Sequence, residues 1–408
     1  GKHDKRQRLT IGPLPPFVMF ALLWLLVLFV LFTTCLLARQ RRRQRAQRTR
    51  DTASAAADAQ PFVSMREVDA AVKALRHHAQ EDQYLAAGLI VQRLQATAAS
   101  HPGTSLPRAA STGLQQLPST HSPASILRRV SEAQTALDMI LGPAQAWRQI
   151  TSADDGTKTY LRREGGLLWT KVVATLHVPV VHVFAVLRES QLYKTWYPCC
   201  VDSEMLREVR DTEILYRVQN KHVLPIITIN EDMILASYLV DCAEGHGGLL
   251  ACGSSPKQED WPETPFPPIP EGRYSFRTDI CALQFYCEPH TDDGCNVTLQ
   301  LCVDDPGAGL PDWFLNLIFA RVLARLFSSL TTSARAISSD PATSPHAKAI
   351  AQQPHIYDQT LRRKIAACKA SQQRRQHVHV TKGPGTGALT SVGQKNRWLQ
   401  CLCLPKTE

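Results

Sequence analysis

One stretch near the end of the chain, LPDWFLNLIFARVLARLFSSL at residues 310–330, most restricts what this sequence can fold into. It is too apolar for the surface helix of an ordinary domain, yet Arg321 and Arg325 make it a poor membrane span. On a helical wheel these arginines share one stripe, about 100° wide, with Ser328 and Ser329. The remaining circumference carries Trp313, Phe314, Leu317, Ile318, Val322, Leu323, Leu326 and Phe327. Such a helix either fills the core of a large α/β domain or lies across a sheet with a removable apolar ligand beside it.

A second apolar stretch lies near the beginning of the chain. Residues 17–38 comprise 22 residues without a charge, and seven arginines follow between residues 39 and 50. At about 1.5 Å per residue the run is long enough to cross a bilayer, and it exceeds the apolar region of a secretory signal peptide. We therefore predict a single transmembrane helix over residues 14–38. Because its following flank is the more basic one, the rest of the chain is expected in the cytosol. Which membrane holds the span stays open.

Charge is distributed unevenly along the chain. Residues 1–50 carry a net charge of +10 and residues 331–408 a net charge of +9, whereas the whole chain carries only +10. The centre is therefore acidic, which argues against nucleic acid as a partner. The basic flanks of the predicted span suit an anionic membrane surface, so a membrane is the partner we expect there.

Composition divides the chain into segments. Ser64 and Glu67 form a capping-box pattern at the start of a helical region, and a stretch rich in Ser, Thr, Pro and Gly follows that region. The predicted segments are a basic, Ala-rich juxtamembrane segment (39–60), a helical spacer (61–98), a flexible linker (99–124), a folded domain (125–336) and a basic, largely disordered tail (337–408).

Within the folded domain the apolar period changes from helical to strand-like. Val297, Leu299, Leu301 and Val303 stand at alternate positions, as in a half-buried strand. The predicted order is one helix, three strands, two short helices, about six strands and one long helix. Consecutive strands joined by short turns predict an α+β fold, an antiparallel sheet with helices on one face.

Three stretches in this order resemble a StAR-related lipid-transfer (START) domain. Residues 178–198, VPVVHVFAVLRESQLYKTWYP, resemble the family's helix pair, which ends in an L-Y-x-x-W-x-P pattern. A string of strands follows, and LPDWFLN at 310–316 resembles the P-x-W-(apolar)-x-N start of the family's C-terminal helix. The resemblance covers residues 125–336, roughly half of the chain. One departure is that Glu231–Asp232 stands where the family often has an Arg-Asp pair, so the resemblance does not carry the family's usual polar contact over to this position.

The resemblance implies a helix-grip fold, in which a curved antiparallel sheet wraps around the long C-terminal helix and one lipid occupies the tunnel between them. It implies a membrane-anchored lipid-binding or lipid-transfer protein that is not an enzyme and needs no cofactor. We also hypothesise that the helix at 311–330 is a gate that moves off the sheet when a lipid enters. The residues expected at the lipid cavity and its lid are Trp196, Met205, Tyr216, Leu299, Leu301, Trp313, Phe314, Leu317, Ile318 and Arg321.

Two other functions stay open. The sequence has no G-x-S-x-G, H-E-x-x-H or Walker A motif, so neither catalytic nor metal-binding residues are predicted. An interaction or regulatory module would have its cavity filled by its own side chains. A helix-grip enzyme of the cyclase or hydrolase kind would need several ionisable residues facing the cavity together. The sequence does not name the lipid, since sterols, phospholipids and ceramides are carried by similar domains of the family.

Overall fold

The computed structural model describes residues 61–100, 105–117, 121–143, 147–153, 156–223, 228–272, 274–291, 293–304 and 312–381. The helices are α2 (Met65–Gln80), α3 (Tyr84–Ser100), α4 (Ser105–Gln115), α5 (Pro123–Leu141), α6 (Val180–Arg188), η4 (Ser190–Thr195), α7 (Ala243–His246), η5 (Gln258–Asp260), α8 (Asp312–Ser339), α9 (Pro345–Gln352), η6 (His355–Leu361) and α10 (Arg362–Thr381). The predicted transmembrane and juxtamembrane segments at 14–38 and 39–60 lie outside the described residues. Within the described part of the chain, no helix is both long and apolar enough to cross a membrane.

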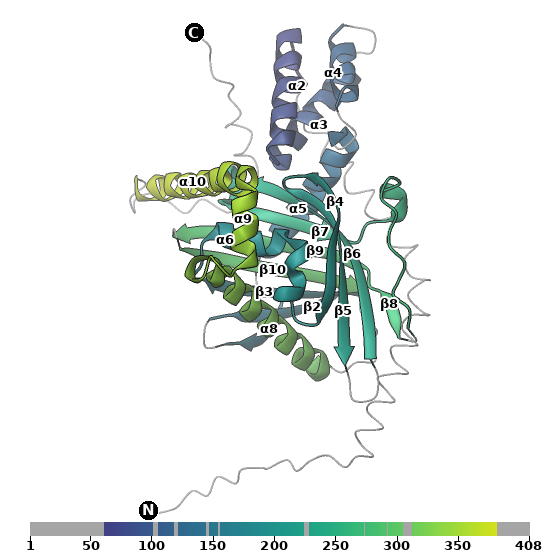
Figure 1. Cartoon of the computed structure of the whole chain (residues 1–408). Coiled ribbons are helices and arrows are strands. Elements are labelled where there is room, and N and C mark those ends of the chain that lie inside the picture. Colours follow the sequence, from purple (N-terminus) through teal and green to yellow (C-terminus); the bar gives the residue numbers. More distant parts are fainter. Residues whose placement is uncertain are drawn as a thin grey trace, which may run out of the picture.

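A single curved sheet organises the domain (Figure 1). Its strands are β1 (Arg148–Ser152), β2 (Lys158–Glu164), β3 (Leu167–Leu176), β4 (Cys200–Arg210), β5 (Glu213–Val223), β6 (Thr228–Cys242), β7 (Gly248–Ser254), β8 (Ser275–Arg277), β9 (Ile280–Thr291) and β10 (Gly294–Asp304). The order is β1-β2-β3-β10-β9-β7-β6-β5-β4, and the short β8 pairs with β6. Every pairing is antiparallel except that of β8, so the predicted antiparallel sheet is confirmed.

The long helix α8 lies on the inner face of this sheet. Its buried side chains follow one another at intervals of three and four residues, and they are Leu323, Phe327, Leu330, Ala334 and Ile337. Val322, which belongs to the apolar arc of the helical wheel, is 52% exposed. A helix packed against one layer buries a stripe about 100° wide, which is narrower than the apolar arc of this helix.

Helices cover the outer face of the sheet as well, which corrects the prediction of helices on one face. Phe285 and Cys287 of β9 belong to the inner core, whereas Tyr286 between them belongs to a cluster with α5. Successive strand residues point to opposite faces, so α5 lies on the outer side. Ala136 and Leu137 of α5 pack in this outer cluster.

The predicted flexible linker at 99–124 contains a packed helix, which corrects that prediction. Helix α4 lies within it, and Ala110 and Leu117 are buried in a core shared with α2, α3 and α5. The closeness of this packing is visible at Gly113, where an added Cβ would lie 2.4 Å from Val72 Cγ2. The Ser- and Pro-rich composition hid a short apolar pattern that gains its stability from tertiary packing.

The helices α2 to α4 project beyond the sheet in Figure 1, and a buried polar cluster joins their base to it. Arg129 of α5 pairs with Glu213 of β5 and donates to the Tyr84 hydroxyl group. Arg210 of β4 pairs with the same Glu213 and with Asp82, at 3.2 Å each. Each of these buried charges has an oppositely charged partner, which offsets the cost of removing it from water.

The chain after α8 is folded through residue 381, so the prediction of a largely disordered tail from 337 onwards was wrong there. Ile356, Tyr357, Leu361 and Cys368 are buried in the main core with α8. Their spacing presents one apolar side of η6 and α10 to the domain. The high content of basic residues concealed this pattern, because most of the charges lie on the other side of the helices. The remaining tail, from residue 382 on, lies outside the described residues.

Candidate ligand-binding cavity

A cavity of about 250 Å³ lies between α8 and the inner face of the sheet. Its walls come from elements that are distant in the sequence and in the strand order. Tyr216 of β5 and Leu235 of β6 line it on one side, and Leu299 of β10 lines it on another. From α8 it receives Leu323, Leu326, Phe327 and Leu330. Most of the lining is aliphatic or aromatic, so the cavity suits a hydrocarbon and not a charged substrate.

The turn after α6 places aromatic rings at one wall. Tyr193 of η4 meets Trp196 edge to face, with ring centroids 5.3 Å apart, and meets Tyr216 in the same manner at 5.7 Å. The Tyr193 hydroxyl group donates to the Leu187 carbonyl oxygen at 2.5 Å, which fixes the ring against the end of α6. The sequence motif that suggested the family is thus a structural element of the cavity wall.

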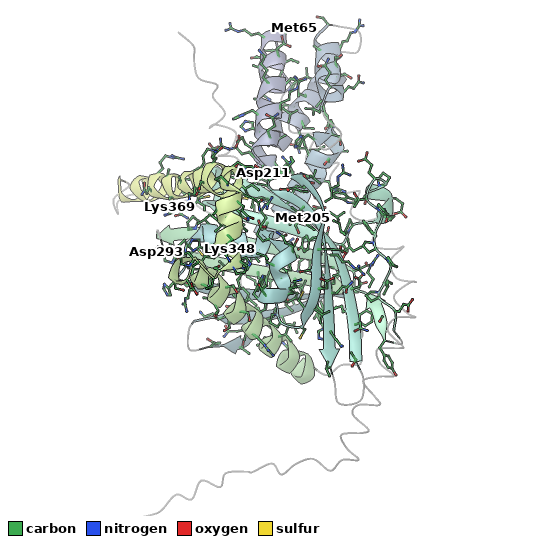
Figure 2. The ribbon with its side chains drawn as sticks, in the orientation of Figure 1. Met65, Met205, Asp211, Asp293, Lys348 and Lys369 are labelled. Carbon is green, nitrogen blue, oxygen red and sulfur yellow. The ribbon has the colours of Figure 1, made fainter. Side chains whose placement is uncertain are left out.

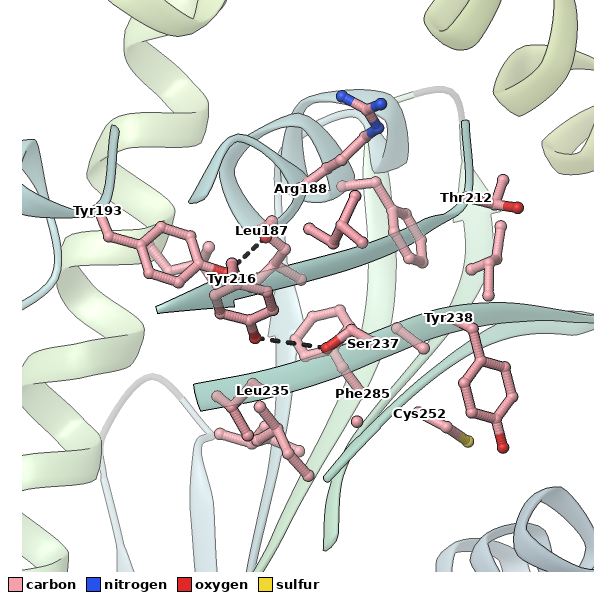
Figure 3. A pocket seen from close by; sticks show the side chains of 18 of the residues that line it. Leu187, Arg188, Tyr193, Thr212, Tyr216, Leu235, Ser237, Tyr238, Cys252 and Phe285 are labelled. Carbon is pink, nitrogen blue, oxygen red and sulfur yellow. Dashed lines mark hydrogen bonds between the residues drawn. The ribbon is translucent and has the colours of Figure 1, made fainter. Parts of the chain in front are cut away.

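Three hydroxyl groups give this apolar cavity a local polar surface (Figure 3). Ser237 Oγ donates to the Tyr216 hydroxyl oxygen at 3.4 Å, and Tyr193 lies beside Tyr216. Burial raises the pKa of both tyrosines, so each stays an uncharged phenol at neutral pH. This wall can therefore hydrogen-bond an uncharged oxygen of a ligand without introducing a charge.

Four of the ten residues predicted for the cavity line it. They are Trp196, Tyr216, Leu299 and Leu301. Met205 is not among the described lining residues, because it lies on β4 at the edge of the sheet and packs within the cluster of Tyr193 and Tyr216 (Figure 2). The side chains of the other five, Trp313, Phe314, Leu317, Ile318 and Arg321, lie outside the described residues although their backbone belongs to α8. That any of the ten contacts a lipid stays a prediction.

The position Glu231–Asp232, where the sequence departs from the family pattern, has a polar contact of its own. Asp232 is fully buried and accepts from Arg217 Nε at 2.5 Å and from Arg277 Nε at 2.7 Å. The same arginines donate to the carbonyl oxygens of Pro268 and Pro267, which holds the Pro-rich loop at residues 261–272. Asp232 points away from the cavity, because the next residue on β6, Met233, lines it.

The end of the cavity beside α6 carries a buried ion pair that the sequence analysis missed. Arg188 lines the cavity and donates from Nη1 to Glu189 Oε1 at 2.9 Å. Glu189 is fully buried and also accepts from the Tyr357 hydroxyl group and from Gln353 Nε2, the latter at 3.3 Å. Arg188–Glu189 lies inside the quoted motif stretch, but nothing in the sequence indicated that their partners come from residues 353 and 357.

The C-terminal segment contributes a further part of the lining that was not predicted. Ile356, Tyr357, Thr360 and Leu361 of η6 all face the cavity. An apolar pattern at 356, 357, 361, 365 and 368 is present in the sequence and could have indicated a packed helix. Among the described residues, no group of three or more His, Cys, Asp or Glu side chains is placed to hold a metal ion.

Comparisons with known proteins find structural similarity only. No protein-family model matches the chain, and no curated protein matches its sequence. The human StAR-related lipid transfer protein 5 is similar in structure at 13% identity and a TM-score of 0.41, over 50% of this chain and 93% of that one. A fragment of a STAR-related lipid transfer protein from Xanthomonas axonopodis is 22% identical with a TM-score of 0.37, over 47% and 99% of the two chains.

Enzymes also occur among the similar structures. The Zhui aromatase/cyclase from Streptomyces sp. R1128 is 13% identical with a TM-score of 0.29, over 43% of this chain and 98% of that one. Similarities at these scores concern the fold, and the function proposed below rests on the cavity and its lining.

Proposed function

We propose that this chain is a membrane-anchored lipid-binding protein that holds one lipid between α8 and the curved sheet. The observation that carries the proposal is the cavity itself, an apolar space in the middle of the domain lined by side chains of α8, β5, β6 and β10. Removing a hydrocarbon chain from water contributes about 0.8 kcal/mol per methylene group, so an apolar cavity of this kind favours a lipid strongly.

The polar groups of the cavity indicate which part of a lipid it can accept. Tyr216 and Ser237 offer hydroxyl groups, and Arg188 contributes a charge that is already shared with Glu189, Glu208 and the carbonyl oxygen of Asp211. A phosphate group inside the cavity would therefore find no uncommitted cation among its described lining residues. We propose an uncharged lipid group here, such as a hydroxyl or a carbonyl, hydrogen-bonded near Tyr216.

The size of the cavity supports the gate hypothesis. Its volume of about 250 Å³ lies below the roughly 300–1,000 Å³ that is typical of small-molecule sites. A full-sized lipid would need α8 to move away from the sheet, and this helix already has an apolar face that a lipid could contact. The gate is part of this proposal, and the predicted lid residues lie in the N-terminal half of α8.

The arrangement relative to a membrane is part of the same proposal. The uncharged run at 17–38 would anchor the chain as a single-pass protein, and the following arginines would keep the domain on the cytosolic side. Exposed basic residues of α10, such as Arg374, would add attraction to an anionic membrane. An anchored domain of this kind suits movement of lipid between neighbouring membranes.

Lipid extraction tests the proposal directly. Residues 61–381, which keep every described element, are isolated from cells, and bound lipids are identified by mass spectrometry. We expect one class of lipid at up to one molecule per chain, and transfer of that lipid between donor and acceptor vesicles. Leu299→Trp should fill the cavity and abolish both, whereas Val201→Trp, at a 52% exposed position of β4, should leave both unchanged.

Two results would favour the alternatives. Folded protein that neither retains nor transfers any lipid of a broad panel would favour an interaction module. Chemical conversion of an added polycyclic or ester substrate, lost in Leu299→Trp, would favour an enzyme and contradict the non-enzymatic role proposed here.

A further inference from the structure

We infer that η6, in the segment after α8, forms the closed end of the cavity and sets the length of the apolar part of the ligand. This inference rests on the proposed lipid-binding function and names a specificity determinant for it. Ile356 and Leu361 line the cavity and are 2% and 6% exposed, so their apolar side chains lie between the cavity and the rest of the core. Shortening either side chain would lengthen the space available to a hydrocarbon chain.

Hydrogen bonds hold η6 firmly against the end of α6. Tyr357 is fully buried and donates its hydroxyl group to Glu189, which is also fully buried. Gln353 precedes η6, and its amide oxygen accepts from Arg188 Nη1 at 3.1 Å. Breaking these contacts would remove hydrogen bonds from the buried Arg188–Glu189 ion pair, so the closed end resists displacement.

Helix α10 fastens the other end of the same segment. Lys364 Nζ lies 3.5 Å from Asp82 Oδ2, and Arg363 Nη2 lies 2.6 Å from Glu81 Oε2. Further along α10, Gln372 Nε2 donates to the Gly247 carbonyl oxygen at 2.8 Å. Since η6 is fixed on both sides, a ligand that is too long cannot push it away without breaking several buried contacts.

Two polar side chains of the lining near η6, Arg188 and Thr212, make their hydrogen bonds to the protein, which suits this end to the apolar part of the ligand. Arg188 donates from Nε to the Asp211 carbonyl oxygen at 2.7 Å, and its two terminal nitrogens donate to Glu189, Gln353 and Glu208. The Thr212 hydroxyl group donates to Asp82 Oδ1 at 2.9 Å. With their hydrogen bonds made to the protein, these groups offer little to a lipid head group, in contrast to the Tyr216–Ser237 wall.

A chain-length series tests this inference in the full-length protein. Ile356→Ala and Leu361→Ala are compared with wild type in competition binding of one lipid class whose members differ only in acyl-chain length. We expect both variants to favour longer chains, by about fourfold for each additional methylene group that becomes buried. Thr360→Leu adds bulk at a half-buried lining position and should shift the preference towards shorter chains while the fold is kept.

Ile337→Ala is the matched control, because Ile337 is a buried core residue at 6% exposure that is not among the lining residues. Its chain-length preference should equal that of wild type. An unchanged preference in both Ala variants and in Thr360→Leu, with wild type still binding lipid, would overturn the role of η6 alone. An equal shift in Ile337→Ala would overturn it too, because general loosening of the core would then be the cause. Wild type that binds no lipid would overturn the proposed function and this inference together.

Discussion

The layer between α8 and the sheet is hollow beside residues 323–330 of the helix, here called the hollow half, and filled beside residues 334–337, the filled half. Leu323, Leu326 and Leu330 line the cavity, whereas Ala334 and Ile337, further along the same helix, are buried in the core with α6. Val181 of α6 is 4% exposed within that filled half. The two halves share one helix and one sheet. The presence of a helix on a sheet therefore does not by itself determine whether side chains fill the space between them.

The difference comes from the curvature of the sheet. Leu299 of β10 and Tyr216 of β5 line the same cavity although three strands, β9, β7 and β6, separate them in the sheet. Side chains from these two parts of the curved sheet line one space beside α8 that they do not fill. In the filled half α6 occupies that space. A hollow that arises from the architecture in this way is expected to hold a ligand rather than to be a local packing defect.

The two halves should differ most in how much stability they lose when buried side-chain atoms are deleted. Leu176→Ala, in the filled half on β3, should lower the free energy of unfolding by about 2–5 kcal/mol, because the deleted atoms leave a new void. Leu299→Ala, on the neighbouring β10, should cost about 1 kcal/mol, since that side chain already borders the cavity and loses fewer contacts. Chemical denaturation of lipid-free protein measures both values. Equal losses at the two positions would show that the halves are packed alike.

Addition of side-chain volume should again destabilise the filled half more than the hollow half, with a smaller effect. Ala334→Leu, at a fully buried position of the filled half, should destabilise the protein by about 1–3 kcal/mol through overpacking. Ala251→Leu, on β7 at the cavity wall, should change the stability by less than about 0.5 kcal/mol, because the added atoms enter existing space. Thermal unfolding of the two variants and wild type provides the measurement. A loss at Ala251→Leu as large as that at Ala334→Leu would contradict the hollow half.

Local patterns in the sequence predicted α8 and the strands of the sheet, but not how they pack against each other. The alternation through Val297 and Leu301 identified β10, and the apolar run after residue 310 identified α8. Both signals are local, because side chains repeat every two residues in a strand and every 3.6 in a helix. The motif at 178–198 gave the position of Trp196 in the cavity wall. The sequence thus predicted the antiparallel sheet and part of the lining.

Local patterns in the sequence do not predict which distant segments of the chain contact each other. Tyr357 and Glu189 are 168 residues apart, and their hydrogen bond depends on how the chain after α8 folds back. Composition predicts a linker and a tail where α4 and the C-terminal helices lie, because polar and basic residues dominate these segments. Their few apolar residues are sufficient to stabilise these helices once a neighbouring surface buries them. Helical stability in proteins comes mainly from such packing, which composition does not reveal.

The smallest expected difference between the two halves is in the volume change of unfolding, which is measured under pressure. Unfolding under pressure is driven by the loss of internal voids, and volume changes of about −20 to −100 mL/mol are usual. Ala251→Leu occupies part of the cavity, so its volume change of unfolding should be less negative than that of wild type, by on the order of 10 mL/mol. Ala334→Leu adds the same side-chain volume in the filled half and should leave the volume change nearly as in wild type. High-pressure fluorescence of the tryptophans measures these values without added lipid. If the two Leu variants shift the volume change equally, the cavity is not a void that unfolding eliminates, and the distinction between the two halves of the layer fails.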